Sequence, residues 1–97
     1  MNINYNKDGD TLTIKIFGRL DTLTAPELET FLLENLDGVK KLVFDLKEME
    51  YTSSAGLRIF LKAKKMMNMG ELIIENVQSD VMEVFEMTGF TDFLTIR

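Results

Sequence analysis

The sequence predicts an α/β fold with a mixed, largely parallel sheet of four to five strands and helices packed on it. Three features lead to this prediction: an alternating pair of strands around Asp8-Gly9, short apolar runs at 42–46 and 72–74, and stretches of helical spacing between them. A strand that follows a helix is typical of a parallel crossover, since parallel neighbours cannot be joined by a tight turn. The elements are predicted to form one domain over residues 1–97, in the order strand, strand, helix, strand, helix, strand, helix, strand.

The first two strands are predicted to form an antiparallel hairpin. Apolar residues alternate with polar ones on both sides of Asp8-Gly9, at Ile3, Tyr5, Leu12, Ile14 and Ile16. Alternation with a period of two indicates strands with one buried face, and Asp-Gly is typical of the tight turn that joins such strands.

The three helices are predicted from their start signals, apolar spacing and glycine stops. Thr24-Ala25-Pro26-Glu27 has the pattern of a capping box with proline in the first turn, so the first helix should begin there and end near Asp37-Gly38. The second should extend through Leu57, Phe60 and Leu61 to Gly70, and the third from Ser79-Asp80 to Gly89. A last edge strand is predicted at 93–96.

The composition excludes several kinds of chemistry. The 97 residues contain no cysteine and no histidine, which removes thiol nucleophiles, Cys/His zinc sites and imidazole acid-base catalysis. The net charge is −5 and the lysines are dispersed among acids, so nucleic acid is not an expected partner. No apolar run approaches the roughly 20 residues of a membrane span, and Met1-Asn2-Ile3-Asn4 lacks the pattern of a secretory leader. We therefore expect a cytoplasmic protein without cofactor, metal or direct membrane insertion.

Two junctions between a predicted strand and a predicted helix carry the candidate site. They are Gly18–Thr24 and Thr52–Leu57, and they bring Asp21 and Ser54 to one end of the sheet if the strands before them are neighbours. A serine hydroxyl at a helix N-terminus is either a simple cap or a place where a phosphate is favoured, and the residues alone favour the cap. An enzyme that uses Ser54 with Asp21 is the least favoured alternative, because no general base of suitable pKa is evident.

Two apolar clusters are assigned mainly to the core. Met66, Met67 and Met69 are interpreted as core filler combined with an exposed helix end, since methionine fills irregular gaps. Phe90 and Phe93, which follow the third helix, are expected to close the core.

Four segments, in their order and spacing, give the chain a resemblance to a known family. They are Gly18-Arg19-Leu20-Asp21 with Thr24-Ala25-Pro26-Glu27, Leu42-Val43-Phe44-Asp45-Leu46, Tyr51-Thr52-Ser53-Ser54-Ala55-Gly56-Leu57, and Phe85-Glu86-Met87-Thr88-Gly89-Phe90. Over nearly its whole length the chain resembles the STAS domains, particularly the bacterial anti-sigma factor antagonists.

This resemblance implies a partner-switching protein that is not an enzyme. In such proteins the unphosphorylated form binds an anti-sigma factor that is also an ATP-dependent serine kinase, phosphorylation of the motif serine breaks the complex, and a serine phosphatase restores it. Alignment on Gly56-Leu57 puts Ser54 at the modified serine and Ser53, its rival, at a position that is commonly aspartate. The residues expected to contact the partner are Asp21, Thr22, Ser53, Ser54, Gly56 and Arg58.

Arg58 departs from the small residue often found after Gly-Leu in these proteins. It puts a cation in the first turn of the second helix, where it opposes the helix dipole and is able to pair with a phosphate or a partner carboxylate. The alternative to the switch is a STAS-like docking subunit of a transport or other signalling complex, without phospho-regulation, in which the serines are caps only.

Overall fold

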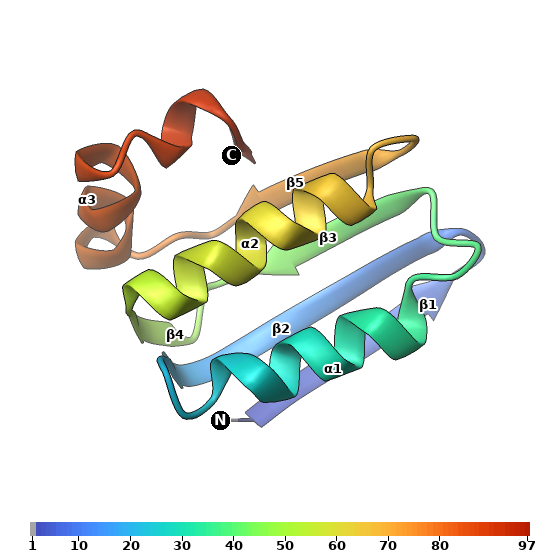
Figure 1. Cartoon of the computed structure of the whole chain (residues 1–97), viewed down its shortest axis with the longest axis horizontal. Coiled ribbons are helices and arrows are strands. Elements are labelled where there is room, and N and C mark those ends of the chain that lie inside the picture. The colour runs from blue at the N-terminus through green and yellow to red at the C-terminus, as the bar shows by residue number, and fades with distance from the viewer. Residues whose placement is uncertain (1) are drawn as a thin grey trace.

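The computed structural model describes residues 2–97, and all the predicted elements are present in it (Figure 1). The elements are β1 Asn2–Asp8, β2 Thr11–Leu20, α1 Ala25–Asn35, β3 Lys41–Asp45, β4 Met49–Thr52, α2 Ser54–Met66, β5 Glu71–Glu75, α3 Ser79–Met87, the short 3-10 helix η1 Phe90–Asp92, and β6 Thr95–Ile96. Met1, the first residue of the segment considered for a secretory leader, lies outside the described residues. The structure adds β4 and η1 to the predicted order.

The sheet is mixed and largely parallel, which confirms the predicted fold class. Within residues 2–97 it has six strands, with β1-β2-β3-β5-β6 as its main path and β4 paired to β2. The β1–β2 pair is antiparallel, and the pairs that β2 makes with β3, and β3 with β5, are parallel. The register places Leu12, Leu42 and Leu72 side by side across the three central strands.

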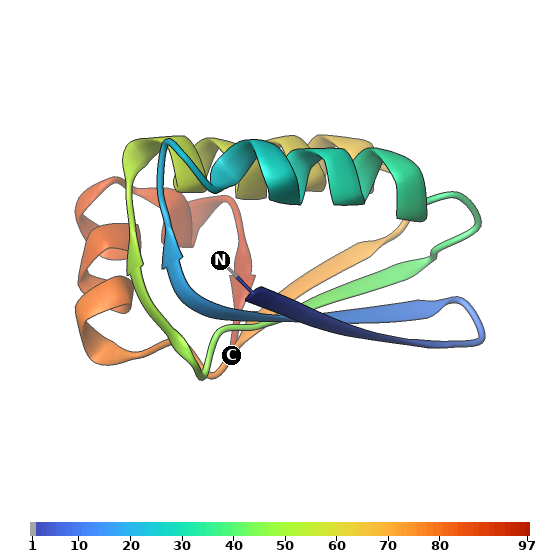
Figure 2. The ribbon, with the colours of Figure 1, turned by 90° about the horizontal axis from the view of Figure 1, so that it is seen from below.

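The long strand β2 pairs in parallel first with β3 and then, toward its end, with β4. Thr11–Lys15 pairs with β3, whereas the end of β2 pairs with β4. The change of partner occurs at Gly18, whose φ of +83° is rarely adopted by residues other than glycine. The N–H of Gly18 donates to the Glu48 carbonyl at 3.0 Å. Figure 2 shows the result: β2 and β4 curve together out of the plane of the main sheet toward the helices.

Helices α1 and α2 lie side by side on one face of the sheet, and α3 packs at its end beside β4 (Figures 1 and 2). The core lies between these layers and contains the inward-facing residues of the strands, among them Leu12, Ile14, Ile16, Leu42, Phe44 and Ile74, together with Leu46 directly after β3. Phe60 of α2 connects the layers, with its ring 5.0 Å from that of Phe44 and 5.7 Å from that of Phe85 on α3. These contacts anchor α2, and with it the candidate serine, on the sheet.

Strand β4 was not predicted because it lacks a regular alternation. Its burial runs from buried Met49 through exposed Glu50 and Tyr51 to buried Thr52. The register shows why: Gly18 pairs with Met49 but Arg19 pairs with Tyr51, so β4 contains one extra residue. Such a bulge breaks the period of two by which a strand is identified in a sequence.

The predicted capping box at Thr24 is wrong. Thr24 is the N-cap residue of α1, but its hydroxyl makes no cap hydrogen bond and lies instead 2.9 Å from the Arg19 carbonyl. The carboxylate of Asp21 accepts the N–H of Thr24 at 3.2 Å and that of Leu23 at 3.0 Å. Asp21 thus accepts the Thr24 N–H that the Glu27 side chain would accept in a capping box, while the Glu27 N–H donates to the Thr24 carbonyl at 3.1 Å.

The two apolar clusters differ in outcome. Met67 is buried while Met66 and Met69 are exposed, which confirms the mixture predicted there. Phe90 is partly buried and packs against the core as expected. The prediction for Phe93 is wrong, since its side chain is 59% exposed. The turn of 3-10 helix directs Phe93 outward and leaves Leu94 as the buried residue of this segment.

Candidate functional site

The pairing of β2 with β4 brings the two predicted junctions to the same edge of the sheet. Leu20 pairs with Thr52, and the N–H of Ser53 donates to the Leu20 carbonyl at 2.9 Å. The chain then turns into α1 after Asp21 and into α2 after Ser53. Asp21 and Ser54 therefore lie at one end of the sheet, as predicted.

The two adjacent serines have different surroundings. Ser53 is the N-cap residue of α2 in an extended conformation, and its carbonyl accepts the N–H of Leu57 at 3.1 Å. Its hydroxyl makes no cap hydrogen bond and is buried without any partner in the described residues, so the interpretation of Ser53 as a side-chain cap is wrong. Ser54 is the first helical residue and is exposed. Of the two hydroxyls, that of Ser54 is the one open to a protein partner.

Gly56 allows the first turn of α2 to lie directly on the two strands. A Cβ built on this buried glycine would be 2.9 Å from both Cγ and the carbonyl oxygen of Leu20, and closer still to Oγ1 of Thr52. Since real Cβ atoms essentially never approach other atoms so closely, only glycine fits. Gly56 thus holds the first turn of α2, and with it Ser54, close to the ends of β2 and β4. This is the close packing of helix on sheet expected from the sequence.

Asp21 organises the other loop. Partial burial raises the pKa of its carboxyl, but hydrogen bonds from the Thr24 and Leu23 N–H groups and the Thr24 hydroxyl, together with the nearby charge of Arg19, outweigh this effect and hold the pKa below its ordinary value. The Arg19 Nε lies 3.7 Å from Asp21 Oδ2. Within residues 2–97 the hydrogen bonds of this carboxylate stay inside its own loop, so the structure gives it no contact with Ser54.

Thr22 and Arg58 line opposite sides of a shallow groove between α1 and α2. The other residues of this groove are Ala25, Pro26, Glu29, Ala55, Ile59 and Lys62. Thr22 and Arg58 are both exposed, as is Ser54 at one end of the helix. Among the six residues predicted to contact a partner, these three thus present side chains to solvent, whereas Gly56 is buried and contributes spacing.

Sequence reasoning did not single out two exposed apolar side chains at the same edge. Leu23, next to Thr22, is 85% exposed. Tyr51 of β4 is 41% exposed, and the Arg19 guanidinium lies over its ring, 4.1 Å from the centroid. The exposure of Leu23 was predictable from the sequence, because an isolated leucine between two threonines falls outside the helical spacing of α1. The exposure of Tyr51 was not predictable without knowledge of β4.

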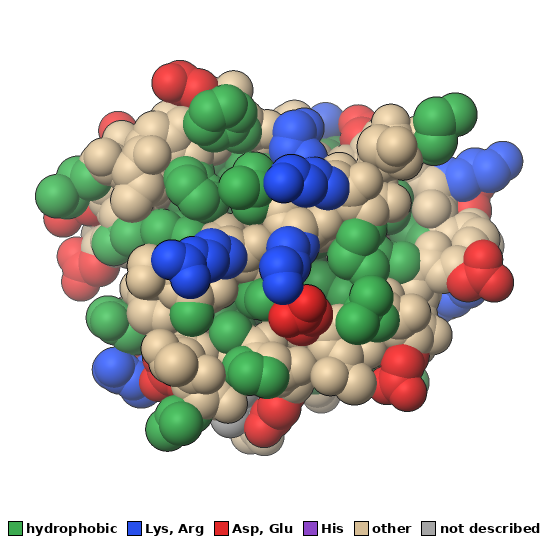
Figure 3. Space-filling view, in the orientation of Figure 1, with side chains coloured by type: hydrophobic (Ala, Val, Ile, Leu, Met, Phe, Trp, Pro, Cys, Tyr) green, Lys and Arg blue, Asp and Glu red, His purple; other side chains and the backbone are tan. Residues whose placement is uncertain are grey.

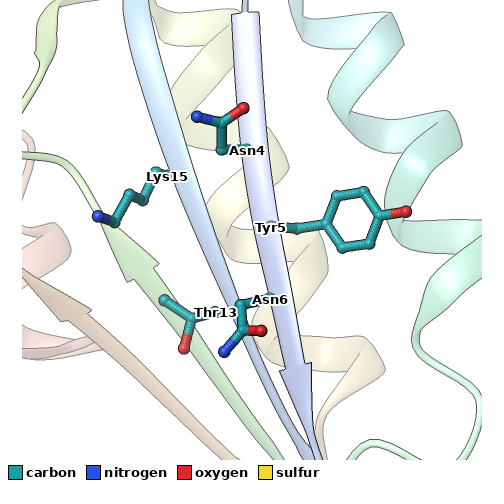
Figure 4. A pocket seen from close by; sticks show the side chains of 5 residues that line it. All are labelled: Asn4, Tyr5, Asn6, Thr13 and Lys15. Atoms are coloured by element: carbon teal, nitrogen blue, oxygen red, sulfur yellow. The ribbon is translucent and has the colours of Figure 1, made fainter.

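A second depression lies along the hairpin and has a different character (Figure 4). It is lined by Asn4, Tyr5, Asn6, Thr13 and Lys15. Tyr5 points toward α1, where its ring lies 4.9 Å from that of Phe31. Lys15 flanks the core residues Ile14 and Ile16, and therefore faces away from the helices. This depression is on a different surface from the two serines.

Neither a metal centre nor a membrane span is found in the described part of the chain. Among residues 2–97, acidic side chains do not gather in threes in a way that would hold a metal ion. None of the helices described combines the length and the apolar character needed to cross a bilayer.

The fold and this edge define a STAS domain: the family model for the STAS domain matches residues 2–97, and the chain belongs to this family. The resemblance identified in the sequence is thereby confirmed. Among its relatives is the anti-sigma-B factor antagonist of Staphylococcus aureus, which is 31% identical over 100 residues that cover 100% of this chain and 93% of that protein.

Solved structures of SpoIIAA share the fold. The unphosphorylated form of this anti-sigma factor antagonist matches with a TM-score of 0.87 and 17% identity, over 99% of this chain and 88% of that one. The phosphorylated form of SpoIIAA, a Bacillus cell fate determinant, matches with a TM-score of 0.77 and 16% identity, over 99% of this chain and 91% of that one.

Proposed function

We propose that this protein is an anti-sigma factor antagonist that works by partner switching. It binds an anti-sigma factor with serine kinase activity while Ser54 is unmodified, and it is released when Ser54 is phosphorylated; a serine phosphatase reverses the modification. The observation that carries the proposal is the difference between the two serines: Ser54 is exposed at the first turn of α2, whereas the Ser53 hydroxyl is buried. Family membership and the name of the Staphylococcus aureus relative support it.

The proposed mechanism is electrostatic. A phosphate carries about −1.5 to −2 charges at neutral pH. On Ser54 it lies at the N-terminus of α2, where the unpaired N–H groups and the helix dipole favour an anion. The free protein therefore tolerates the phosphate without a change of shape. In a packed interface the same charge must be desolvated and meets the partner's own groups, and a loss of about 1.4 kcal/mol already weakens binding tenfold.

The assignment of the acceptor is tested by phosphorylation of purified variants. The serine kinase of anti-sigma type from the same genome is incubated with ATP and the wild-type protein, Ser54→Ala or Ser53→Ala, and the modified site is mapped by mass spectrometry. We expect phosphate on Ser54 in the wild type and in Ser53→Ala, and none in Ser54→Ala. Phosphate on Ser53 alone would contradict the assignment.

The electrostatic mechanism is tested with an isosteric pair. Ser54→Asp and Ser54→Asn have side chains of nearly equal size, so the comparison isolates charge. With the same kinase as binding partner, we expect Ser54→Asp to bind at least about tenfold more weakly than Ser54→Asn, which corresponds to about 1.4 kcal/mol. Equal affinity of the two variants would show that charge is not the cause of release.

A further inference from the structure

The exposed face of α2 is strongly basic in an acidic protein. Of the 11 basic residues in the chain, α2 contains four, Arg58, Lys62, Lys64 and Lys65, and it contains none of the 16 acidic ones, although the net charge is −5. All four are exposed. Figure 3 shows basic side chains gathered in the middle of this surface, over α2.

Three of these cations are aligned with the candidate serine. Ser54, Arg58, Lys62 and Lys65 are separated by four, four and three residues, which places them in one row along a helix. We call Arg58, Lys62 and Lys65 the basic row of α2. The row begins one turn after Ser54 and borders the groove that Thr22, Arg58 and Lys62 line. It is therefore continuous with the proposed partner surface.

Within the structure, one cation of this row already binds a carboxylate. Lys62 Nζ donates to Glu29 Oε2 of α1 at 2.8 Å, and both side chains remain partly exposed. Within residues 2–97, Lys62 is the one cation of α2 in an ion pair, so Arg58 and Lys65 keep their charges available. A carboxylate from another protein would find two such cations on the same face.

We propose that the basic row of α2 binds an acidic segment of the partner protein, with Arg58 as the residue that links this contact to Ser54. The inference rests on the proposed function, whose partner it describes chemically. A phosphate on Ser54 lies four residues before Arg58, the spacing at which opposite charges pair on a helix. It therefore competes with the partner's carboxylates for Arg58 and also repels them, which makes release specific to this row.

Other polyanions fit the surface less well. Nucleic acid recognition needs an extended basic surface, but the row is bordered by α1, which contains Glu27, Glu29 and Glu34. A lipid surface would require an available apolar face of the helix, and that face of α2 is buried in the core through Leu57 and Phe60. A discrete acidic protein segment suits a short row of three cations, because complementary charges guide docking and specify the partner.

The proposal is tested with a synthetic probe that needs no kinase. A 16-residue peptide of glutamate and alanine, and its counterpart with glutamine, are titrated into the isotope-labelled full chain at low salt and followed by amide chemical shifts. We expect the glutamate peptide to shift amides of α2 most strongly and the glutamine peptide to bind far more weakly. Shifts spread evenly over all lysines, or equal binding of both peptides, would overturn the proposal.

Matched variants locate the contact. Arg58→Gln and Lys65→Gln should each weaken the glutamate peptide about two- to fivefold, the range for one exposed ion pair. Lys15→Gln removes the same charge on the other face of the sheet and should leave the affinity unchanged (Figure 4). Glu29→Gln releases Lys62 and should strengthen binding. If Lys15→Gln has the same effect as Arg58→Gln, net charge alone explains binding and the proposal is wrong.

Two further experiments distinguish this proposal from nucleic acid binding and from the proposed function. A 16-nucleotide oligothymidylate that binds the row more tightly than the glutamate peptide would overturn the assignment to a protein partner. Ser54→Asp should weaken peptide binding relative to Ser54→Asn, and equal affinities would refute the link through Arg58. Because no kinase is present, failure to phosphorylate Ser54 would refute the proposed function without changing these results.

Discussion

The substitution Gly56→Ala sets two physical effects of opposite sign against each other. In an exposed helix, replacing glycine with alanine stabilises the protein by about 1 kcal/mol, because alanine loses less backbone entropy on folding. At Gly56 the added methyl group would meet the Leu20 carbonyl oxygen at 2.9 Å and would overlap Oγ1 of Thr52. Since a backbone carbonyl in a paired strand cannot move freely, we expect the steric effect to be the larger one.

The magnitude follows from the nature of the contacts. Extra atoms in a well-packed core cost about 1–3 kcal/mol, and contact with rigid backbone on one side and a buried threonine on the other puts Gly56 at the upper end, about 3 kcal/mol. The helix gain of about 1 kcal/mol offsets part of this cost. The free energy of unfolding should therefore fall by about 2 kcal/mol, which a domain with a stability of about 5–15 kcal/mol survives.

The assay is urea unfolding followed by far-ultraviolet circular dichroism. With an m-value of about 1.5 kcal/mol per molar, the loss corresponds to a midpoint lower by about 1.3 M at unchanged slope. Arg58→Ala is the control, because it also leaves an alanine near the start of α2, but on the exposed side, and it should change stability by less than about 0.5 kcal/mol. If Gly56→Ala is as stable as the wild type or more so, α2 does not lie against β2 and β4 as described.

Three other predictions test the site and the core. The depressed pKa of Asp21 means that its charge stabilises the native state fully above the unfolded-state pKa, and that this contribution is lost as the pH falls through the lower folded-state pKa. Asp21→Asn keeps an acceptor oxygen but removes the charge, so its unfolding free energy should fall less steeply than that of the wild type in the acid range; parallel curves would contradict the depressed pKa. Ser53→Ala should lower the unfolding free energy by less than about 0.5 kcal/mol, or raise it, because the Ser53 hydroxyl makes no hydrogen bond. Loss of a genuine serine cap would lower it by about 1 kcal/mol. Phe60→Ala should cost about 3–5 kcal/mol by urea unfolding, because the ring is fully buried, while Phe93→Ala at an exposed ring should cost less than about 1 kcal/mol; similar losses would show that Phe93 belongs to the core after all.

The fold class was predictable because the signals that define it are local and regular. The hairpin around Asp8-Gly9 and the apolar run at 42–46 were identified by periodicity and turn chemistry, which depend on neighbours in sequence. Strand β4 depends instead on β2, since a bulge at Glu50 removes its alternation and its pairing exists only after β2 has bent at Gly18. A long-range partner of this kind leaves no period in the sequence.

The candidate site was predictable in location but not in local geometry. Two strand-to-helix junctions were expected at one end of the sheet, and the pairing of Leu20 with Thr52 brings them there. The sequence pattern at Thr24 fits a capping box, yet the Asp21 carboxylate accepts the Thr24 N–H that the Glu27 side chain would accept in such a box. Several polar side chains competed for the same donors, and short-range pattern rules do not rank such competitors.

The same limit explains why the two serines were equivalent in the sequence and differ in the structure. Ser53 continues the extended conformation of β4, with its N–H bonded to the Leu20 carbonyl, and so turns its hydroxyl into the protein. Ser54 is already helical and points its side chain outward. The boundary between strand and helix falls between them because Gly56, two residues later, lets α2 begin against Leu20 and Thr52. Which of the two serine side chains is exposed is thus determined by the packing of a buried glycine.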